Sequence, residues 1–209
     1  MTILLATPIV RFHYVNVFKG VNSPLAPTRF KKKLTVLLSK TDPEHMAFKD
    51  SYATHLRGIV ASQGGNPDLR AVSWRDGDAP SPKGKIDTNT VGHWMITPWC
   101  DPDAALLLRY MRGVEAHLAE DSSHIYSGAF GRVSMKLFAY TKGTPGITLG
   151  LVGVLKTKDG PRLDTGVSEE EVLASLGIGG GAAPVTSGVG RPYPEITDPA
   201  ARAALGLSL

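Results

Sequence analysis

The alternation of apolar and polar positions is strictest from Arg132 to Tyr140, where an apolar residue occupies every second position. A period of two predicts a β-strand that buries one of its faces. The segment 30–39 alternates in the same way in its middle. Runs rich in β-branched and aromatic residues predict further strands at 8–18, 92–97 and 147–156. The strands 132–140 and 147–156 are close enough in sequence to predict a hairpin.

Helical periodicity replaces this alternation in three segments. The first is predicted over 41–64, because Thr41 or Asp42 can cap a helix whose first turn accepts Pro43 and Glu44. Apolar residues at helical spacing also predict a second helix over 104–118. A short helical segment is expected over 168–176.

The composition favours a fold with many turns and short elements, since the 209 residues include 23 Gly and 15 Pro. Such a chain is better suited to a β fold than to a helical bundle. We therefore expect a mainly β protein, a barrel with helical additions. One domain is predicted over 1–160, followed by a partly flexible, Gly/Pro-rich tail over 161–209.

A single cysteine, Cys100, excludes an intramolecular disulfide and a zinc site built from cysteines. A reducing compartment such as the cytoplasm is therefore expected. The apolar segment 1–10 is short and follows no basic region, so we interpret it as the lead-in to a strand and not as a signal peptide. The sequence contains no run of 18 apolar residues, and no membrane association is predicted.

Charge is distributed in blocks along the chain. Residues 1–40 have a net charge of +7 and residues 126–160 a net charge of +4. The segments 41–125 and 161–209 carry −4 and −3. If the fold brings the two basic blocks together, a polyanion is a reasonable partner. Ordinary solubilising charge is the alternative explanation.

The strand 132–140 carries the most informative chemistry. Its apolar face predicts a core contact, whereas its other face combines cations with aromatic rings: Arg132, Ser134, Lys136, Phe138 and Tyr140. Aromatic rings stack on unpaired bases and cations follow the phosphates, so this face is typical of a protein that binds single strands. The alternative is that Phe138 and Tyr140 pack beneath a loop or the tail.

Five other residues are candidates for contact with nucleic acid. Lys31 and Lys33 share one face of the strand 30–39, although lysines there could also protect a sheet edge. Neither face of the strand 8–18 is uniformly apolar, and a bulge midway would explain this. Arg11 and Tyr14 on that strand are candidates for contact, whereas Phe12 is expected in the core. Tyr126 is a further candidate for stacking. Trp74, Trp94 and Trp99 could also stack, although Trp94 is expected in the core.

Several short blocks resemble the family of OB-fold single-stranded DNA-binding (SSB) proteins of tailed phages, and more distantly the SSB of the T-odd podoviruses. They occur in the family's order over residues 8–165: Arg11-Phe12-His13-Tyr14, Asn16-Val17-Phe18, 33–38, 75–78, 125–132, Phe138-Ala139-Tyr140, Gly146-Ile147 and Gly150-Leu151. The resemblance implies a five-stranded OB barrel with one helix packed on it. It also implies sequence-tolerant binding of single-stranded DNA during phage DNA replication or recombination.

The chain departs from the podovirus pattern in two places. Those proteins end in a strongly acidic tail with a terminal aromatic residue, whereas this chain ends in 203–209 without an acidic run. Recruitment of partners through the tail is therefore not expected. The segment 103–118 is also more helical in its pattern than the loop usual in the family.

The residues are also compatible with two other classes of function. Asp76, Asp78 and Asp87 could belong to a metal-dependent nuclease, although Asp-Gly-Asp is more often a turn, and metal catalysis needs further converging carboxylates. A replisome adaptor that binds proteins through its barrel is the second. The favoured hypothesis is a protein without enzymatic activity and without a cofactor, whose partners are single-stranded DNA and replication or recombination proteins of phage or host. A homodimer is left open.

Overall fold

The computed structural model describes residues 2–23, 26–64, 70–81, 84–140 and 145–163. All of these belong to one compact unit, Met1–Gly166. The predicted tail beyond residue 163, with its helical segment 168–176, lies outside the described residues. Within the described part of the chain, no helix is long and apolar enough to cross a membrane.

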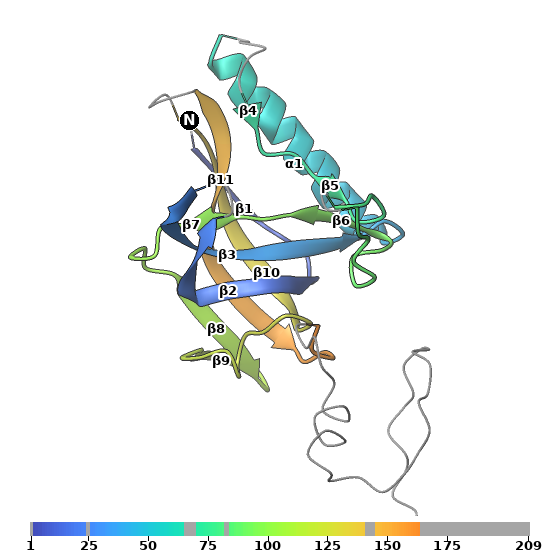
Figure 1. The fold of residues 1–209 in the computed structure, drawn as a ribbon, viewed down its shortest axis with the longest axis vertical. Helices are drawn as coiled ribbons and strands as arrows, with labels where there is room; N and C mark the ends of the chain where they lie inside the picture. Colours follow the sequence, from blue (N-terminus) through green and yellow to red (C-terminus); the bar gives the residue numbers. More distant parts are fainter. Residues whose placement is uncertain (1, 24–25, 65–69, 82–83, 141–144, 164–209) are drawn as a thin grey trace, which may run out of the picture. The chain divides into compact units, whose positions relative to one another are not determined.

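Five strands pair in a closed ring. In chain order these strands are β2 (Val10–Ser23), β3 (Ala26–Ser39), β7 (Trp99–Cys100), β10 (Phe130–Tyr140) and β11 (Gly146–Lys158). The pairs β2–β3, β3–β7, β10–β11 and β10–β2 are antiparallel. A parallel pair between β7 and β11 completes the ring. In Figure 1, β2 and β3 cross in front of β10 and β11. A five-stranded barrel of this Greek-key kind is the OB-fold, so the expected fold class is confirmed.

Six further strands extend this ring. β1 (Thr2–Ala6) pairs with β10, β4 (Arg70–Ala71) with β11, and β5 (Arg75–Asp76) with β6 (His93–Ile96), which itself pairs with β3. β8 (Leu107–Arg112) lies parallel to β11 and antiparallel to β9 (Glu115–Leu118). The segment 1–10 therefore contains a strand of its own, and strands β2 and β3 extend beyond the predicted 8–18 and 30–39.

The helix predicted over 104–118 is wrong, because this segment forms the hairpin of β8 and β9. Gly113 adopts a φ of 62° at the turn, a left-handed conformation that favours glycine. The apolar run at the start of this segment is compatible with a strand as well as with a helix. The parallel pairing of residues 107–110 with 153–156 of β11, which lies far away in sequence, decides between them.

The predicted first helix is confirmed as α1 (Pro43–Ser62). Its cap is Asp42, whose side chain accepts hydrogen bonds from the backbone N–H groups of Glu44 and His45. The helix packs against β3 and β10, and buries Tyr52 and Ile59. The Tyr52 hydroxyl donates to the carbonyl of Val72 at 2.7 Å, and burial raises the pKa of Tyr52 to about 12.

The interior of the barrel is apolar, with fully buried side chains from every strand of the ring except the short β7, whose Cys100 is almost fully buried. Phe12, Leu34, Val36, Val133, Met135, Leu137 and Leu149 each have 0% of their surface exposed. The expected core role of Phe12 is confirmed. Trp94 is partly buried and packs against this core, as expected.

We predict that Asp42→Ala lowers the free energy of unfolding by about 1 kcal/mol, because the first turn of α1 loses its cap. Chemical denaturation monitored by circular dichroism measures the change. Asp50→Ala, at an exposed position within α1, is the matched control and should change stability by less than about 0.5 kcal/mol. Equal losses in the two variants would contradict the capping role.

Candidate nucleic-acid interface

The two faces of β10 differ as the alternation predicts. Val133, Met135 and Leu137 are fully buried in the core, whereas Arg132 and Lys136 are exposed on the opposite face. Phe138 is half-buried and Tyr140 is 37% exposed. The side chains proposed for contact with nucleic acid are therefore on the outside of the barrel.

A groove of ≈ 240 Å³ opens on this outer face where β7, β10 and β11 meet. Trp99 of β7, together with Lys136 and Phe138 of β10, lines it, and Thr148 and Gly150 of β11 lie between them. A Cβ atom on Gly150 would lie 2.9 Å from two carbons of Lys136. The absence of a side chain at this position lets Lys136 lie over β11, with its Nζ 5.4 Å from the centre of the Phe138 ring.

Strand β3 brings the other basic block to the same groove. Lys33 is the register partner of Trp99, and the Nζ of Lys31 lies 3.0 Å from the centre of the Trp99 ring. The groove thus combines lysines of the segments 1–40 and 126–160, which the charge pattern marked as separate blocks. Trp99 joins these lysines. From the sequence it is only one of three tryptophans that could stack, because local patterns do not reveal its register with Lys33.

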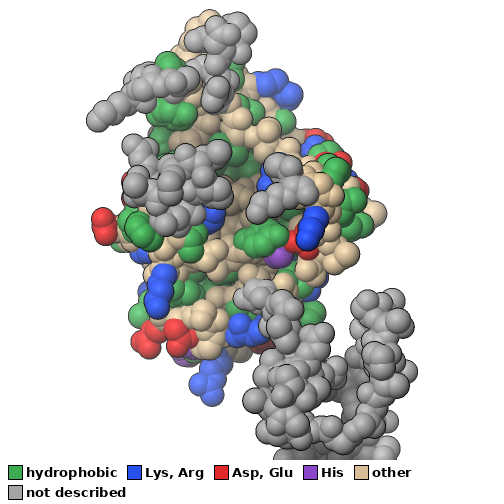
Figure 2. Space-filling view, in the orientation of Figure 1, with side chains coloured by type: hydrophobic (Ala, Val, Ile, Leu, Met, Phe, Trp, Pro, Cys, Tyr) green, Lys and Arg blue, Asp and Glu red, His purple; other side chains and the backbone are tan. Residues whose placement is uncertain are grey.

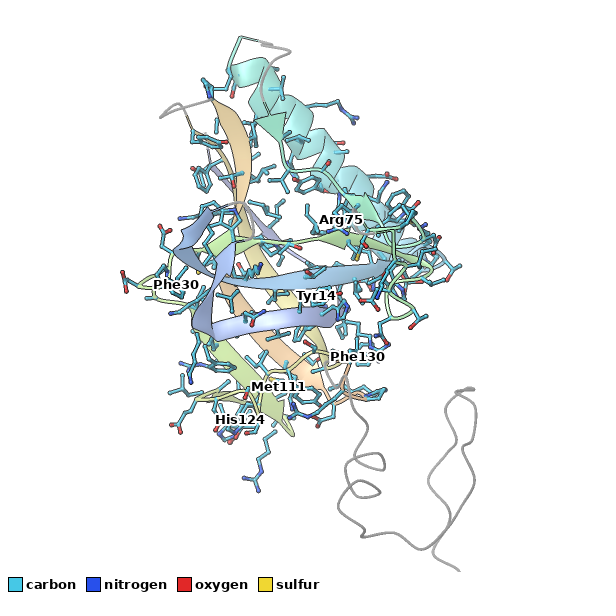
Figure 3. The ribbon with its side chains drawn as sticks, viewed as in Figure 1. Tyr14, Phe30, Arg75, Met111, His124 and Phe130 are labelled. Atoms are coloured by element: carbon cyan, nitrogen blue, oxygen red, sulfur yellow. The ribbon has the colours of Figure 1, made fainter. Side chains whose placement is uncertain are left out.

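Tyr14 lies further along the same outer surface. The expected bulge in this strand is confirmed, because Tyr14 and Val15 together oppose the single residue Leu34 of β3. Tyr14 has a φ of 45° and is 54% exposed. A bulge turns a side chain out of the regular alternation, and Figure 3 shows Tyr14 in front of the sheet, below Arg75.

A second hollow, of ≈ 300 Å³, adjoins Tyr14 and extends over β3 and β6. The hydroxyls of Thr35 and Thr97, 2.9 Å apart, lie in its lining. Thr97 precedes Trp99 by two residues, a spacing of about 7 Å along an extended chain. The hollow and the groove therefore follow each other across the outer surface. Figure 2 shows this side of the molecule, with a recess near its centre.

We call these residues the aromatic–basic face, which consists of Tyr14, Lys31, Lys33, Trp99, Lys136 and Phe138. Tyr140 follows Phe138 by two residues on β10. The aromatic side chains stand between the basic ones, an arrangement suited to a chain of flat rings joined by phosphates.

The two proposed arginines lie elsewhere. The Arg11 guanidinium lies 5.7 Å from the centre of the Phe130 ring and donates a hydrogen bond to the carbonyl of Pro161. Burial lowers the pKa of Arg11. Arg132 lines a different hollow, together with Leu107 and Arg109 of β8. Neither arginine lines the groove between Trp99 and Phe138.

The structure does not place Tyr126 where a base could stack on it. This residue is only 8% exposed, and its hydroxyl donates to Asp159 at 2.7 Å. Arg162 lies 4.3 Å from the centre of its ring. Burial and the Asp159 carboxylate raise the pKa of Tyr126. The residue belongs to the core because segment 125–129 folds over β2, where the N–H of Gly128 donates to the carbonyl of Phe12.

The aspartates of the nuclease hypothesis do not converge on one point. Lys40 forms ion pairs with both Asp76 and Asp78, and its hydrogen bonds lower the pKa of each carboxyl group. Asp87 instead accepts hydrogen bonds from His13 and Tyr14. Among the described residues, no three His, Cys, Asp or Glu side chains are grouped so that they could hold a metal ion.

A Greek-key barrel of five strands with this aromatic–basic face defines an OB-fold protein of the kind on whose surface nucleic acid strands lie. A family model described as "Enterobacter phage Enc34, ssDNA-binding protein" matches residues 1–177. The chain therefore belongs to the family of the Enc34 phage ssDNA-binding protein. Comparison with curated protein sequences gives no match.

Solved structures of two phage proteins share the fold. The single-stranded DNA-binding protein from bacteriophage Enc34, in complex with ssDNA, is 20% identical with a TM-score of 0.57, over 76% of this chain and 88% of that one. The second is gp2.5, a single-stranded DNA binding protein encoded by bacteriophage T7. It is 16% identical with a TM-score of 0.55, over 88% of this chain and 100% of that one.

We predict that Tyr14→Gly is more stable than Tyr14→Ala by about 1 kcal/mol, because the backbone at this position is left-handed and only glycine adopts it without strain. Both variants lose the ring, so the difference in their free energies of unfolding isolates the backbone. The same pair of substitutions at Tyr110, in the regular strand β8, should give the opposite order. A more stable alanine variant at position 14 would contradict the strain.

Proposed function

We propose that this protein binds single-stranded DNA without sequence preference and acts in phage DNA replication or recombination, in the cytoplasm of the host cell. Membership of the Enc34 ssDNA-binding family supports this function. The observation on which the mechanism depends is the groove between Trp99 and Phe138, with Lys136 beside it and Lys31 over the Trp99 ring.

Stacking is the main interaction that we propose for this groove. Each base stacked on an aromatic side chain contributes about 1–3 kcal/mol, and all four bases offer a flat face. The groove is lined between its rings by Thr148 and Gly150, which offer few groups able to distinguish one base from another. Binding of this kind tolerates any sequence.

Phosphate contacts are the second proposed interaction. Lys136 lines the groove, Lys31 lies over its Trp99 ring, and Lys33 is the register partner of Trp99. Each phosphate that they neutralise releases a condensed counterion, so the affinity should fall steeply as salt rises. Arg132 lies further along β10, on the same outer face, where a longer strand of DNA could extend.

The hydrogen-bond partners of Asp76, Asp78 and Asp87 also support a binding role without catalysis. The oxygen atoms of Asp76 and Asp78 face Lys40, and those of Asp87 face His13 and Tyr14. A catalytic metal would have to displace these donors. We expect replication or recombination proteins as further partners.

We predict that Phe138→Ala weakens binding to oligo-dT at least fivefold without unfolding the protein, because one stacking contact of about 1–3 kcal/mol is lost. Quenching of intrinsic fluorescence measures the affinity, and circular dichroism measures the fold. Tyr140→Ala should act in the same direction. Loss of fold in either variant would show that the ring belongs to the core.

We also predict that Lys136→Ala weakens binding and reduces the dependence of affinity on salt, because one phosphate contact is lost. Lys158→Ala, exposed at the opposite end of the β10–β11 hairpin, is the matched control and should bind like the wild-type protein. Absence of binding at low salt, or binding insensitive to salt, would contradict the proposed function. Mg²⁺-dependent degradation of ssDNA that is lost in Asp76→Ala would support a nuclease instead.

A further inference from the structure

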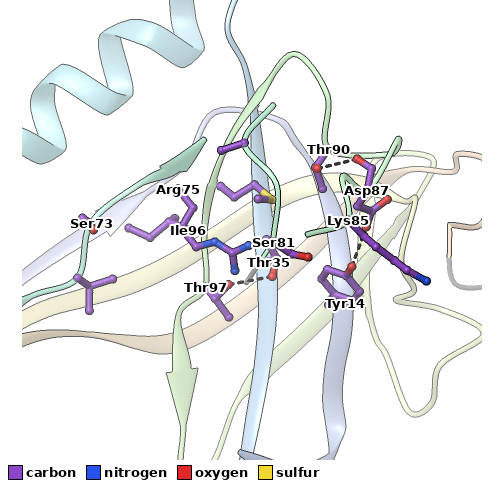
Figure 4. Close-up of a pocket in the computed structure, with 13 residues that line it drawn as sticks. Tyr14, Thr35, Ser73, Arg75, Ser81, Lys85, Asp87, Thr90, Ile96 and Thr97 are labelled. Carbon is purple, nitrogen blue, oxygen red and sulfur yellow. Dashed lines mark hydrogen bonds between the residues drawn. The ribbon is translucent and has the colours of Figure 1, made fainter. Parts of the chain in front are cut away.

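Two neighbouring side chains hold the ring of Tyr14 in place. Its hydroxyl donates a hydrogen bond of 2.7 Å to Asp87, and the same carboxylate oxygen lies 2.8 Å from the Nε2 atom of His13. The rings of His13 and Tyr14 are stacked, with their centres 3.8 Å apart and their planes 30° apart. Figure 4 shows Tyr14 and Asp87 at one side of the hollow.

We propose that Tyr14 and this hollow form a preformed subsite for one nucleotide of the bound strand, with Asp87 and His13 as positioning residues. This subsite rests on the proposed function and is separate from the groove between Trp99 and Phe138. Its ligand is a base with its phosphate, of any sequence.

The ring of Tyr14 offers one face to a base. His13, which is only 2% exposed, covers one face, whereas Tyr14 itself remains 54% exposed. A base that stacks on the exposed face would extend the stack of two rings to three. Since the ring is already held, binding does not have to order it, and less conformational entropy is lost.

The hollow beside the ring supplies charge for a phosphate. Arg75 and Lys85 line it together with Tyr14 (Figure 4). Both cations are exposed. Their carboxylate neighbour, Asp87, is occupied by Tyr14 and His13.

The charge state of Asp87 suits this positioning role. Burial raises the pKa of the carboxyl group, but the hydrogen bonds from Tyr14, His13 and the N–H of Asn89 outweigh that effect and lower it to about 2. At neutral pH the carboxylate is therefore ionised and accepts from both rings. Protonation below that pKa would remove this contribution, so the contact should persist throughout the pH range of ordinary binding experiments.

The loop that carries Asp87 is itself firmly held. The hydroxyl oxygen of Thr90, 2% exposed, lies 2.8 and 3.0 Å from the carbonyl oxygens of Asp87 and Gly77, which share its one hydrogen. A Cβ atom on Gly77 would lie 2.0 Å from the carbonyl oxygen of Thr90, so the two loops are in close contact. This loop supports Asp87, the partner of Tyr14, whose backbone is left-handed with a φ of 45°. Strained residues of this kind cluster at functional sites.

A double-mutant cycle on ssDNA binding tests the proposal. Tyr14→Ala should weaken binding to oligo-dT about tenfold, through loss of a stacked base. Asp87→Asn should weaken it about threefold in the wild-type protein, and should have no effect when Tyr14 is already alanine. Asp78→Asn, in the neighbouring loop, is the matched control and should bind like the wild-type protein.

Three results would overturn this subsite. If Tyr14→Ala binds like the wild-type protein while Phe138→Ala is weakened, the subsite is absent and the proposed function stands. If Asp87→Asn weakens binding equally in the Tyr14→Ala background, Asp87 does not act through Tyr14. If the wild-type protein does not bind ssDNA at low salt, the proposed function fails and the subsite with it.

Discussion

The closure of the barrel at Gly131 is the constraint on which the rest of the structure depends. This residue pairs with Val10 of β2 on one edge of β10 and with Lys156 of β11 on the other, so the ring closes there. A Cβ atom at this position would lie 2.0 Å from the carbonyl oxygen of Leu155 and 2.7 Å from the ring of Phe12. Glycine is therefore required for two strands and a buried ring to approach so closely.

Closure of a small barrel has a direct consequence for the surface. Side chains that point outward from β3, β7, β10 and β11 must spread over one curved sheet, so residues distant in sequence become neighbours. Lys33 and Trp99 meet in this way, and Phe138 lines the same groove as Trp99. The aromatic–basic face follows from the order of the strands, whereas overall net charge contributes little to it.

The same geometry separates residues that look alike in sequence. Tyr14 and Tyr140 lie within strands of the ring and Tyr126 lies just before one. Tyr126 is nevertheless buried and bonded to Asp159, while the other two remain exposed. The bulge at Tyr14 could be inferred from the mixed faces of its strand. The left-handed backbone and the contacts with His13 and Asp87 could not, because Asp87 lies 73 residues away.

Sequence by itself determined the elements with strong local signals: the alternating strand 132–140, the capped helix that begins after Asp42, and the core face of the hairpin. The period of side chains and the chemistry of a cap depend only on near neighbours. Tertiary structure decided the remainder. The segment 107–118 forms a hairpin because its first strand pairs with the edge of β11. Trp99 lies near Lys136 and Phe138 because a parallel pairing places it beside Gly150. Such pairings involve residues far apart in the chain, so local patterns do not encode them.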